Sequence, residues 1–299
     1  MEHIPKEKSV LAMSPKNDPV LRVESGSSVV FETCDCFGNK IQSEDHLFSS
    51  VGWDSVNPAT GPLYIEGAEP NDILKVEILD ISIADKGVMT TAPNFGVLGD
   101  LFKEEVTKII PIKNGQVIFN DKIQIPIKPM IGVMGVAPTE GEILAGTPGE
   151  HGGNMDCKRL VKGSIIYLPV NVSGALLSMG DLHAAQADGE IVMCAVEIPG
   201  KVTVKATVVK NKSLPLPILM EGGHIMTIAS AELLDDAATN ATKNMHTFLM
   251  NELNMDLHES GMLLSLVGEL RICQVVNPLK TARMEIPKWV LEHYNYTMI

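Results

Sequence analysis

Apolar runs of strand length, separated by Gly, Pro and Asn, fill the first two thirds of the chain and restrict it to a strand-rich fold. Most of these runs are rich in β-branched residues, which favour the pleated, half-buried surface of a sheet. The runs are 29–37, 76–83, 106–112, 117–127, 164–170 and 202–209. We therefore predict a β-sandwich or barrel core over residues 1–225.

The last third of the chain has a different pattern, with apolar residues at helical spacing. Residues 229–253 place apolar side chains three or four positions apart, and residues 259–270 continue apolar with few breakers. This pattern predicts an α+β part over residues 226–299, with helices packed at one end of the strands. The 299 residues contain no internal repeat or obvious linker, so we expect one compact unit.

A polar segment, residues 179–190, lies between two apolar runs, 174–179 and 191–198, that are typical of buried strands. Its carboxylates, histidine and glutamine are Asp181, His183, Gln186, Asp188 and Glu190. In an extended segment Asp181 and His183 share a face, whereas in a helical turn His183 and Gln186 are neighbours. Both conformations predict a pocket. The alternative is an ordinary hairpin connection built on the Asp-Gly pair.

The string Gly180-Asp-Leu-His-Ala-Ala-Gln-Ala-Asp-Gly-Glu190 resembles the signature of the acetamidase/formamidase family, except that the family usually has Gly in place of Ala187. Further segments match the family in the expected order: 32–38, 57–62, 67–72, 151–156, 274–278 and 284–287. The resemblance implies hydrolysis of short linear amides, such as formamide and acetamide, to a carboxylate and ammonia. It also implies a jelly-roll-like β-sandwich with a small β-barrel, and a homodimer or higher homo-oligomer.

Amide hydrolysis defines which residues to look for, because the enzyme must activate a nucleophile, stabilise an oxyanion and protonate nitrogen. A divalent metal, with Zn²⁺ as the expected ion, lowers the pKa of its bound water to about 7 and polarises the carbonyl. The candidate ligands are Asp35, Asp181 and His183. The catalytic candidates are Glu190, His183 and Gln186, with Glu190 or Glu197 as general acid and base. The candidates for substrate binding are Asn154, Asp156 and Glu197.

Asp35 is a candidate ligand because it lies in the middle of an apolar run, residues 30–37, that is expected to form a strand. In an extended run it shares a face with Phe31 and Thr33, and a buried carboxylate is costly unless it is paired or bound to metal. The alternative is a solvated Asp35 at the end of the strand, before Gly38.

Two alternatives to the metal mechanism use a protein nucleophile, either a cysteine or a serine. A third alternative is that the chain is not an enzyme. Cys157 precedes Lys158, whose positive charge could lower the pKa of the Cys157 thiol. The favoured interpretation of each of the five cysteines is nevertheless a buried, unreactive thiol. A serine nucleophile is disfavoured because the sequence contains no Gly-x-Ser-x-Gly elbow. A non-catalytic β-sandwich that binds a small ligand is the alternative of a different class, but it does not require the complete polar set of residues 181–190.

Charge and hydropathy bear on the partners of the chain. The net charge of −13 argues against nucleic acids and anionic membranes as partners, because both are polyanions. Residues 1–8 are followed by no apolar leader region, and no run approaches the ~18 apolar residues of a membrane span. We expect a cytoplasmic protein with reduced cysteines.

Overall fold

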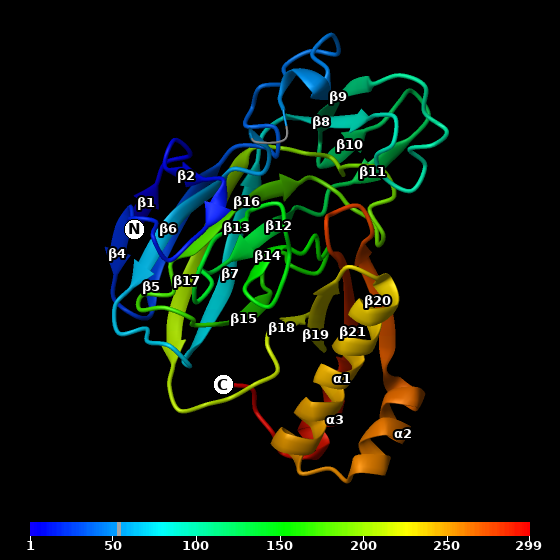
Figure 1. The fold of residues 1–299 in the computed structure, drawn as a ribbon. Coiled ribbons are helices and arrows are strands. Elements are labelled where there is room, and N and C mark those ends of the chain that lie inside the picture. The colour runs from blue at the N-terminus through cyan, green and yellow to red at the C-terminus, as the bar shows by residue number, and fades with distance from the viewer. Residues whose placement is uncertain (53–54) are drawn as a thin grey trace.

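The strand-rich part of the chain builds two large sheets that face each other (Figure 1). A computed structural model describes residues 1–52 and 55–299. In spatial order, the strands of the nine-stranded sheet are β1 (Glu2–Ile4), β5 (Ser27–Thr33), β17 (Gly200–Val209), β7 (Ile73–Ile83), β15 (Ile165–Pro169), β18 (Ile218–Glu221), β19 (His224–Ala231), β21 (Lys280–Pro287) and β20 (Glu269–Gln274). Most neighbouring strands in this sheet run antiparallel.

The second sheet contributes the strand that leads into the polar segment. Its strands are β14 (Gly152–Asn154), β12 (Met130–Gly135), β16 (Leu177–His183), β6 (Ala59–Ile65) and β2 (Ser9–Val10), with β4 (Leu21–Val23) also paired to β6. Phe31 and Val204 of the first sheet and Leu63 and Leu182 of the second are buried in one hydrophobic cluster. Since each sheet supplies apolar side chains to the same core, the two form a β-sandwich.

A smaller sheet lies beside the sandwich, at the upper right of Figure 1. It contains β8 (Lys86–Thr91), β9 (Val106–Lys113), β10 (Gln116–Ile118) and β11 (Gln124–Pro126), and a separate pair joins β3 (Ala12–Met13) to β13 (Ile143–Leu144). Within the described chain the outer strands β8 and β11 are not paired with each other. This sheet is therefore open, unlike the small closed barrel that the sequence resemblance implied.

The helices all lie in the last third of the chain, as predicted, and cover one end of the nine-stranded sheet (Figure 1). They are α1 (Leu234–Leu253), α2 (Leu257–Val267) and α3 (Trp289–His293), and a short 3₁₀ turn, η1 (Phe48–Ser50), lies earlier in the chain. Phe248 of α1 and Ile225 of β19 share a second buried cluster. Asp256 caps α2 by accepting the backbone N–H groups of His258 and Glu259. The predicted class, mainly β with a C-terminal α+β part, is confirmed.

Three predicted elements differ from the structure. The run 117–127 is divided into β10 and β11, because the Asn120 side chain accepts the backbone N–H groups of Lys122 and Ile123 and closes a turn. The run 191–198 forms no strand and contributes only isolated bridges through Glu197. The helix expected from residue 229 begins at Leu234, because residues 229–231 complete β19. No helix in the described ranges is long and apolar enough to cross a membrane.

Candidate functional site

The polar segment begins inside β16, whose seven residues are all buried. Asp181 has a φ of 58°, in the left-handed region that non-glycine residues rarely adopt. Its Oδ1 lies 3.4 Å from Nε2 of His183, the last residue of the strand. Asp181 and His183 therefore lie together, as the extended conformation predicts.

The His183 ring is held by Gln186, three residues further along the chain. Nδ1 of His183 lies 2.8 Å from Oε1 of Gln186, whose Nε2 donates to the backbone oxygen of Asp156 at 2.8 Å. Because an amide oxygen only accepts, Nδ1 carries the hydrogen and Nε2 faces the cavity. Gln186 itself is not among the residues that line the cavity and contacts it only through the His183 ring.

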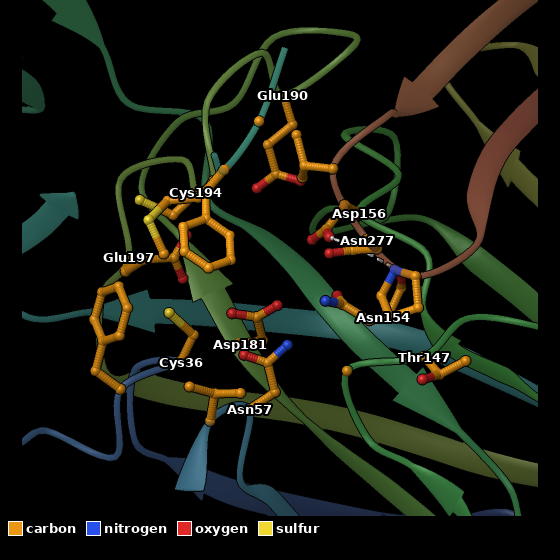
Figure 2. Close-up of a pocket in the computed structure, with 18 of the residues that line it drawn as sticks. Cys36, Asn57, Thr147, Asn154, Asp156, Asp181, Glu190, Cys194, Glu197 and Asn277 are labelled. Atoms are coloured by element: carbon orange, nitrogen blue, oxygen red, sulfur yellow. Dashed lines mark hydrogen bonds between the residues drawn. The ribbon is translucent and has the colours of Figure 1, made fainter. Parts of the chain in front are cut away.

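Buried carboxyl groups surround Nε2 of His183. The nearest oxygens are Oε1 of Glu197 at 3.1 Å, Oδ1 of Asp181 at 3.4 Å and Oδ1 of Asp156 at 3.8 Å. A ligand oxygen of Glu190 lies within 4.8 Å of ligand atoms of Asp156 and His183. Figure 2 shows the carboxyl groups of Asp156, Asp181, Glu190 and Glu197 turned toward a common space.

Burial of so many acidic groups changes their affinity for protons. Burial, followed by the charge of Asp181, raises the pKa of Asp156 to about 6. Burial also raises the pKa of Glu197 to about 8 and, with the charge of Asp156, holds the pKa of Glu190 well above its ordinary value. Burial alone lowers the pKa of His183, but the carboxylates of Glu197 and Asp181 raise it well above the usual range. Without a cation, the site therefore retains protons at neutral pH.

Several of these carboxyl oxygens lack hydrogen-bond partners. Within the described part of the chain, Oδ1 of Asp181, Oε2 of Glu190 and Oε2 of Glu197 are buried and accept no hydrogen bond. An unpaired buried carboxylate oxygen is costly, and a divalent cation would satisfy both its charge and its lone pairs. The imidazole nitrogen and carboxylate oxygens gathered here are ligand types that Zn²⁺ accepts, so the residues present fit a divalent metal.

The structure does not bring Asp35 into this cluster, and it brings the neighbouring Cys36 instead. Strand β5 ends at Thr33, and Oδ1 of Asp35 accepts the backbone N–H groups of Phe37 at 3.0 Å and Asn39 at 2.7 Å. The Asp35 carboxylate thus closes a turn, while Sγ of Cys36 lies within 4.8 Å of ligand atoms of Asp181 and Glu197. The prediction of Asp35 as a ligand assumed that strand alternation continues past Thr33, and the turn ends it.

Asparagine side chains hold the carboxylates of Asp156 and Asp181 in place through hydrogen bonds. Nδ2 of Asn277 donates to Oδ2 of Asp156 at 2.6 Å. In the amide orientation that satisfies its neighbours, Asn154 donates to Oδ2 of Asp181 at 3.0 Å and accepts from Nδ2 of Asn57 at 2.9 Å. Asn154 and Asp156 therefore lie in the site, as predicted. Asn277 belongs to the matched segment 274–278, but the sequence alone assigned it no role.

Asp188, the remaining carboxylate of the polar segment, faces away from the cavity. It accepts two hydrogen bonds from the Arg283 guanidinium, at 2.7 and 2.9 Å, and lies 2.9 Å from Nζ of Lys158. Gly189 and Glu190 follow with φ values of 96° and 45°, which turn the Glu190 side chain back toward His183. The ion pair at Asp188 fixes the loop that carries Glu190.

Gly132 on β12 provides the space in which two carboxylates meet. A Cβ at this position would lie 2.5 Å from Oδ1 of Asp156 and 2.5 Å from Oδ2 of Asp181. Real Cβ atoms do not approach oxygen so closely, so any side chain here displaces both acids.

We expect Gly132→Ala to lower the free energy of unfolding by about 1–3 kcal/mol, as overpacking of a rigid interior does. Gly261→Ala is the matched control, because Gly261 lies in helix α2 with no atom within 4 Å of an added Cβ. The control should raise the free energy of unfolding by about 0.5–1 kcal/mol, since alanine is the better helix former. Urea denaturation measures both, and a Gly132→Ala protein of unchanged stability would contradict the close packing described here.

The carboxylate cluster lies in a cavity of about 430 Å³. Cys157 is fully buried and does not line this cavity, whereas Cys36 and Cys194 do. Burial raises the pKa of both of these lining thiols, so they are protonated and poor nucleophiles at neutral pH. The geometry thus presents a buried histidine among acids, and no reactive thiolate among the lining cysteines.

Comparison with known proteins extends the sequence resemblance. Residues 12–146 and 142–227 match the family model described as the Acetamidase/Formamidase family. The chain is 29% identical to a formamidase from Methylophilus methylotrophus over 254 residues, which cover 64% of this chain but only 62% of that protein. A crystal structure of an acetamidase from Bacillus halodurans matches with a TM-score of 0.96 and 49% identity, over 98% of this chain and 99% of the other. The structure of a protein described as a predicted acetamidase/formamidase from Thermoanaerobacter tengcongensis matches with a TM-score of 0.97 and 45% identity, over 99% of each chain.

Proposed function

This chain belongs to the acetamidase/formamidase family, and we propose that it is an amidase that hydrolyses linear amides to a carboxylate and ammonia. One observation carries the proposal: Nε2 of His183 faces a cavity among buried carboxyl groups whose free oxygens have no protein partner in the described ranges. Formamide and acetamide, the amides that the sequence resemblance implies, are the first substrates to test.

His183 and the surrounding acids are the proposed ligands of a divalent metal. His183, Asp156 and Asp181 would hold it, with Glu197 and Cys36 close enough to complete the set. The chemistry supplied by a bound Zn²⁺ is a water of lowered pKa and a polarised amide carbonyl. Gln186 keeps Nε2 of His183 free for this purpose by accepting the hydrogen of Nδ1. The buried carboxylates offset the positive charge of the ion and exclude bulk water from it.

Glu190 is the proposed proton donor to the leaving nitrogen. Its carboxyl group lines the cavity, and one of its oxygens lies within 4.8 Å of a carboxylate oxygen of Asp156. Burial, followed by the charge of Asp156, holds its pKa well above the ordinary value, which favours the protonated form that a proton donor requires. Glu197, with a pKa raised to about 8, is the second candidate for this role.

The test of the proposed function is ammonia release from formamide and acetamide by the purified protein, with elemental analysis of its metal. We expect ammonia in proportion to enzyme and a near-stoichiometric divalent ion. His183→Ala serves as the comparison and should release none. A metal-loaded protein that binds amides without releasing ammonia would support the alternative of a non-catalytic binding protein.

Cys157→Ala is expected to leave kcat/KM within about tenfold of the parent value, because the thiol lies outside the cavity. Loss of a true nucleophile would lower it by several orders of magnitude. Ammonia assays at several amide concentrations measure the effect of Cys157→Ala on kcat/KM, and a well-folded but inactive Cys157→Ala protein would favour the cysteine mechanism.

The five cysteines are all free thiols, which accords with the cytoplasmic location that we propose.

We also propose that the chain forms a homodimer through α2 and β20. Leu266 and Met262 of α2 are 81% and 66% exposed, and Leu270 and Ile272 are exposed on β20, the edge strand of the nine-stranded sheet. An exposed apolar face beside the unpaired edge strand of a sheet can bind the same surface of a second copy of the chain. The predicted surface 263–267 lies here, although Leu264 is buried inside the protomer.

Light scattering should give about twice the protomer mass for the parent protein, and Leu266→Lys should shift the mass toward that of the monomer. Burying an unpaired charge at an apolar interface is unfavourable, which is the reason for the shift. Leu101→Lys is the control, because Leu101 is 65% exposed and belongs to neither α2 nor β20. A parent protein that remains monomeric over a wide concentration range, with normal activity, would contradict the dimer.

A further inference from the structure

The cavity has an apolar side that the chemistry of His183 and the carboxylates does not use. Beside the acidic cluster, it is lined by Phe37, Val56, Phe95, Met193 and η1 residue Phe48. Phe37 and Phe48 meet edge to face with centroids 6.1 Å apart, and Phe48 and Phe95 do so at 5.8 Å. Such contacts hold the three rings in fixed orientations.

These residues form a hydrophobic cluster of their own. Together with Cys36, Ile41, Val51 and Cys194 they constitute a core cluster distinct from the interior of the sandwich and from the packing of α1 on its sheet. Several members both pack within the cluster and line the cavity. The cavity therefore has a charged side at His183 and a rigid apolar side built on loops.

The volume of the cavity far exceeds that of the smallest amides. Its 430 Å³ lies within the ~300–1,000 Å³ typical of sites that enclose drug-sized ligands. Acetamide has four non-hydrogen atoms, so most of the space around it would contain water in contact with aromatic and aliphatic side chains. Displacing such weakly bonded water by an apolar group strengthens binding.

We infer that the preferred substrates are linear primary amides with an apolar acyl chain of about four to six carbons, bound against the cluster of Phe37, Phe48 and Phe95. The inference rests on the proposed amidase function and concerns the same cavity. The amide group lies at His183 and Glu190, and the acyl chain extends toward Met193 and Val56. Acyl groups of one or two carbons, which the sequence resemblance favours, leave the apolar side in contact with water.

The experiment is a substrate series of formamide, acetamide, butyramide and hexanamide, with ammonia release as the readout. Burial of each methylene should raise kcat/KM about fourfold, so hexanamide should exceed acetamide by about 10²-fold. Calorimetric titration with acetamide and hexanamide gives a second readout that does not depend on turnover, and hexanamide should bind more tightly. Equal or better kcat/KM with acetamide, together with no tighter binding of hexanamide, would overturn the inference.

Two substitutions locate the acyl chain. Phe95→Ala removes part of the wall and should lower the ratio of hexanamide to acetamide kcat/KM by about tenfold. Val56→Phe fills the apolar side and should lower the same ratio further. Ile123→Ala is the matched control, because Ile123 is exposed on the small sheet and does not line the cavity; its ratio should equal that of the parent. Unchanged ratios in both cavity variants would exclude this wall as the acyl site.

The outcomes separate the inference from the function on which it rests. Ammonia from acetamide at a rate that hexanamide does not exceed retains the amidase and overturns the acyl preference. No ammonia from any amide overturns the amidase, and the titration then decides whether the apolar side binds an acyl chain. In that case, tighter binding of hexanamide than of acetamide supports an acyl-binding site on the apolar side, and equal binding of the two amides excludes such a site.

Discussion

Removal of divalent metal from the purified protein is expected to abolish amide turnover, and return of Zn²⁺ is expected to restore it. Without the ion, Oδ1 of Asp181, Oε2 of Glu190 and Oε2 of Glu197, which accept no hydrogen bond within the described ranges, remain buried, and the Lewis acid that would lower the pKa of a bound water is lost. Ammonia release before dialysis against a chelator, after it, and after metal addition measures the effect. Full activity in a sample shown to contain no metal would exclude this mechanism and favour a cysteine nucleophile.

The metal-free protein should also have a distinctive dependence of stability on pH. The pKa values of Asp156 and Glu197 are about 6 and about 8 in the folded chain, above the ordinary values near 4 of an unfolded one. The folded state therefore binds more protons at these two groups, so their contribution to stability is fully present below about pH 4 and is lost as pH rises through 6 and 8. Thermal denaturation of metal-free and metal-loaded samples across this window checks the direction. A metal-free protein that becomes more stable over the same range would contradict the clustering of acids.

Glu190→Gln is expected to lower turnover by about 10²–10⁴ while leaving the metal content unchanged, because glutamine keeps the shape of glutamate but cannot deliver the proton. Steady-state ammonia assays with elemental analysis measure both quantities. Glu104→Gln, on an exposed glutamate that does not line the cavity, is the control and should behave as the parent.

Three other results would reassign Glu190. Loss of metal from Glu190→Gln would make it a ligand. A lower melting temperature with a normal rate would make it a structural residue. Glu197, whose pKa is raised to about 8, would be the proton donor if Glu190→Gln had a normal rate. In that case Glu197→Gln should lose about 10²-fold in rate while retaining its metal.

The parts of the site that lie close together in the sequence could be predicted from it. The spacing predicts Asp181 beside His183 in an extended segment and His183 beside Gln186 in a helical turn, and the structure has both contacts, at 3.4 Å and 2.8 Å. The β-rich first part and the helices of the last third also follow from residue periodicity, since each element buries one face. Local pattern and local geometry agree at these positions.

The remaining parts of the site depend on contacts between distant segments. Cys36 enters the site instead of Asp35 because a turn ends the alternation of β5, and no strand pattern signals this change of direction. Glu197 is presented by isolated bridges to Val88 and His183 and not by a strand of its own. The apolar wall is likewise formed by loops, whose approach to one another a single sequence does not specify.

The hydrogen bond from Asn277 to Asp156 bears on how the protein is made. Asp156 and His183 are synthesised long before Asn277, yet Gln274 and Asn277 close the frame around Asp156 from near the end of the chain. On the ribosome, the growing chain therefore passes through a period in which its acids are present but their frame is incomplete. The frame that would hold a metal is therefore complete only after residue 277 has been synthesised, and a fragment that ends before residue 274 would lack the asparagine that fixes Asp156.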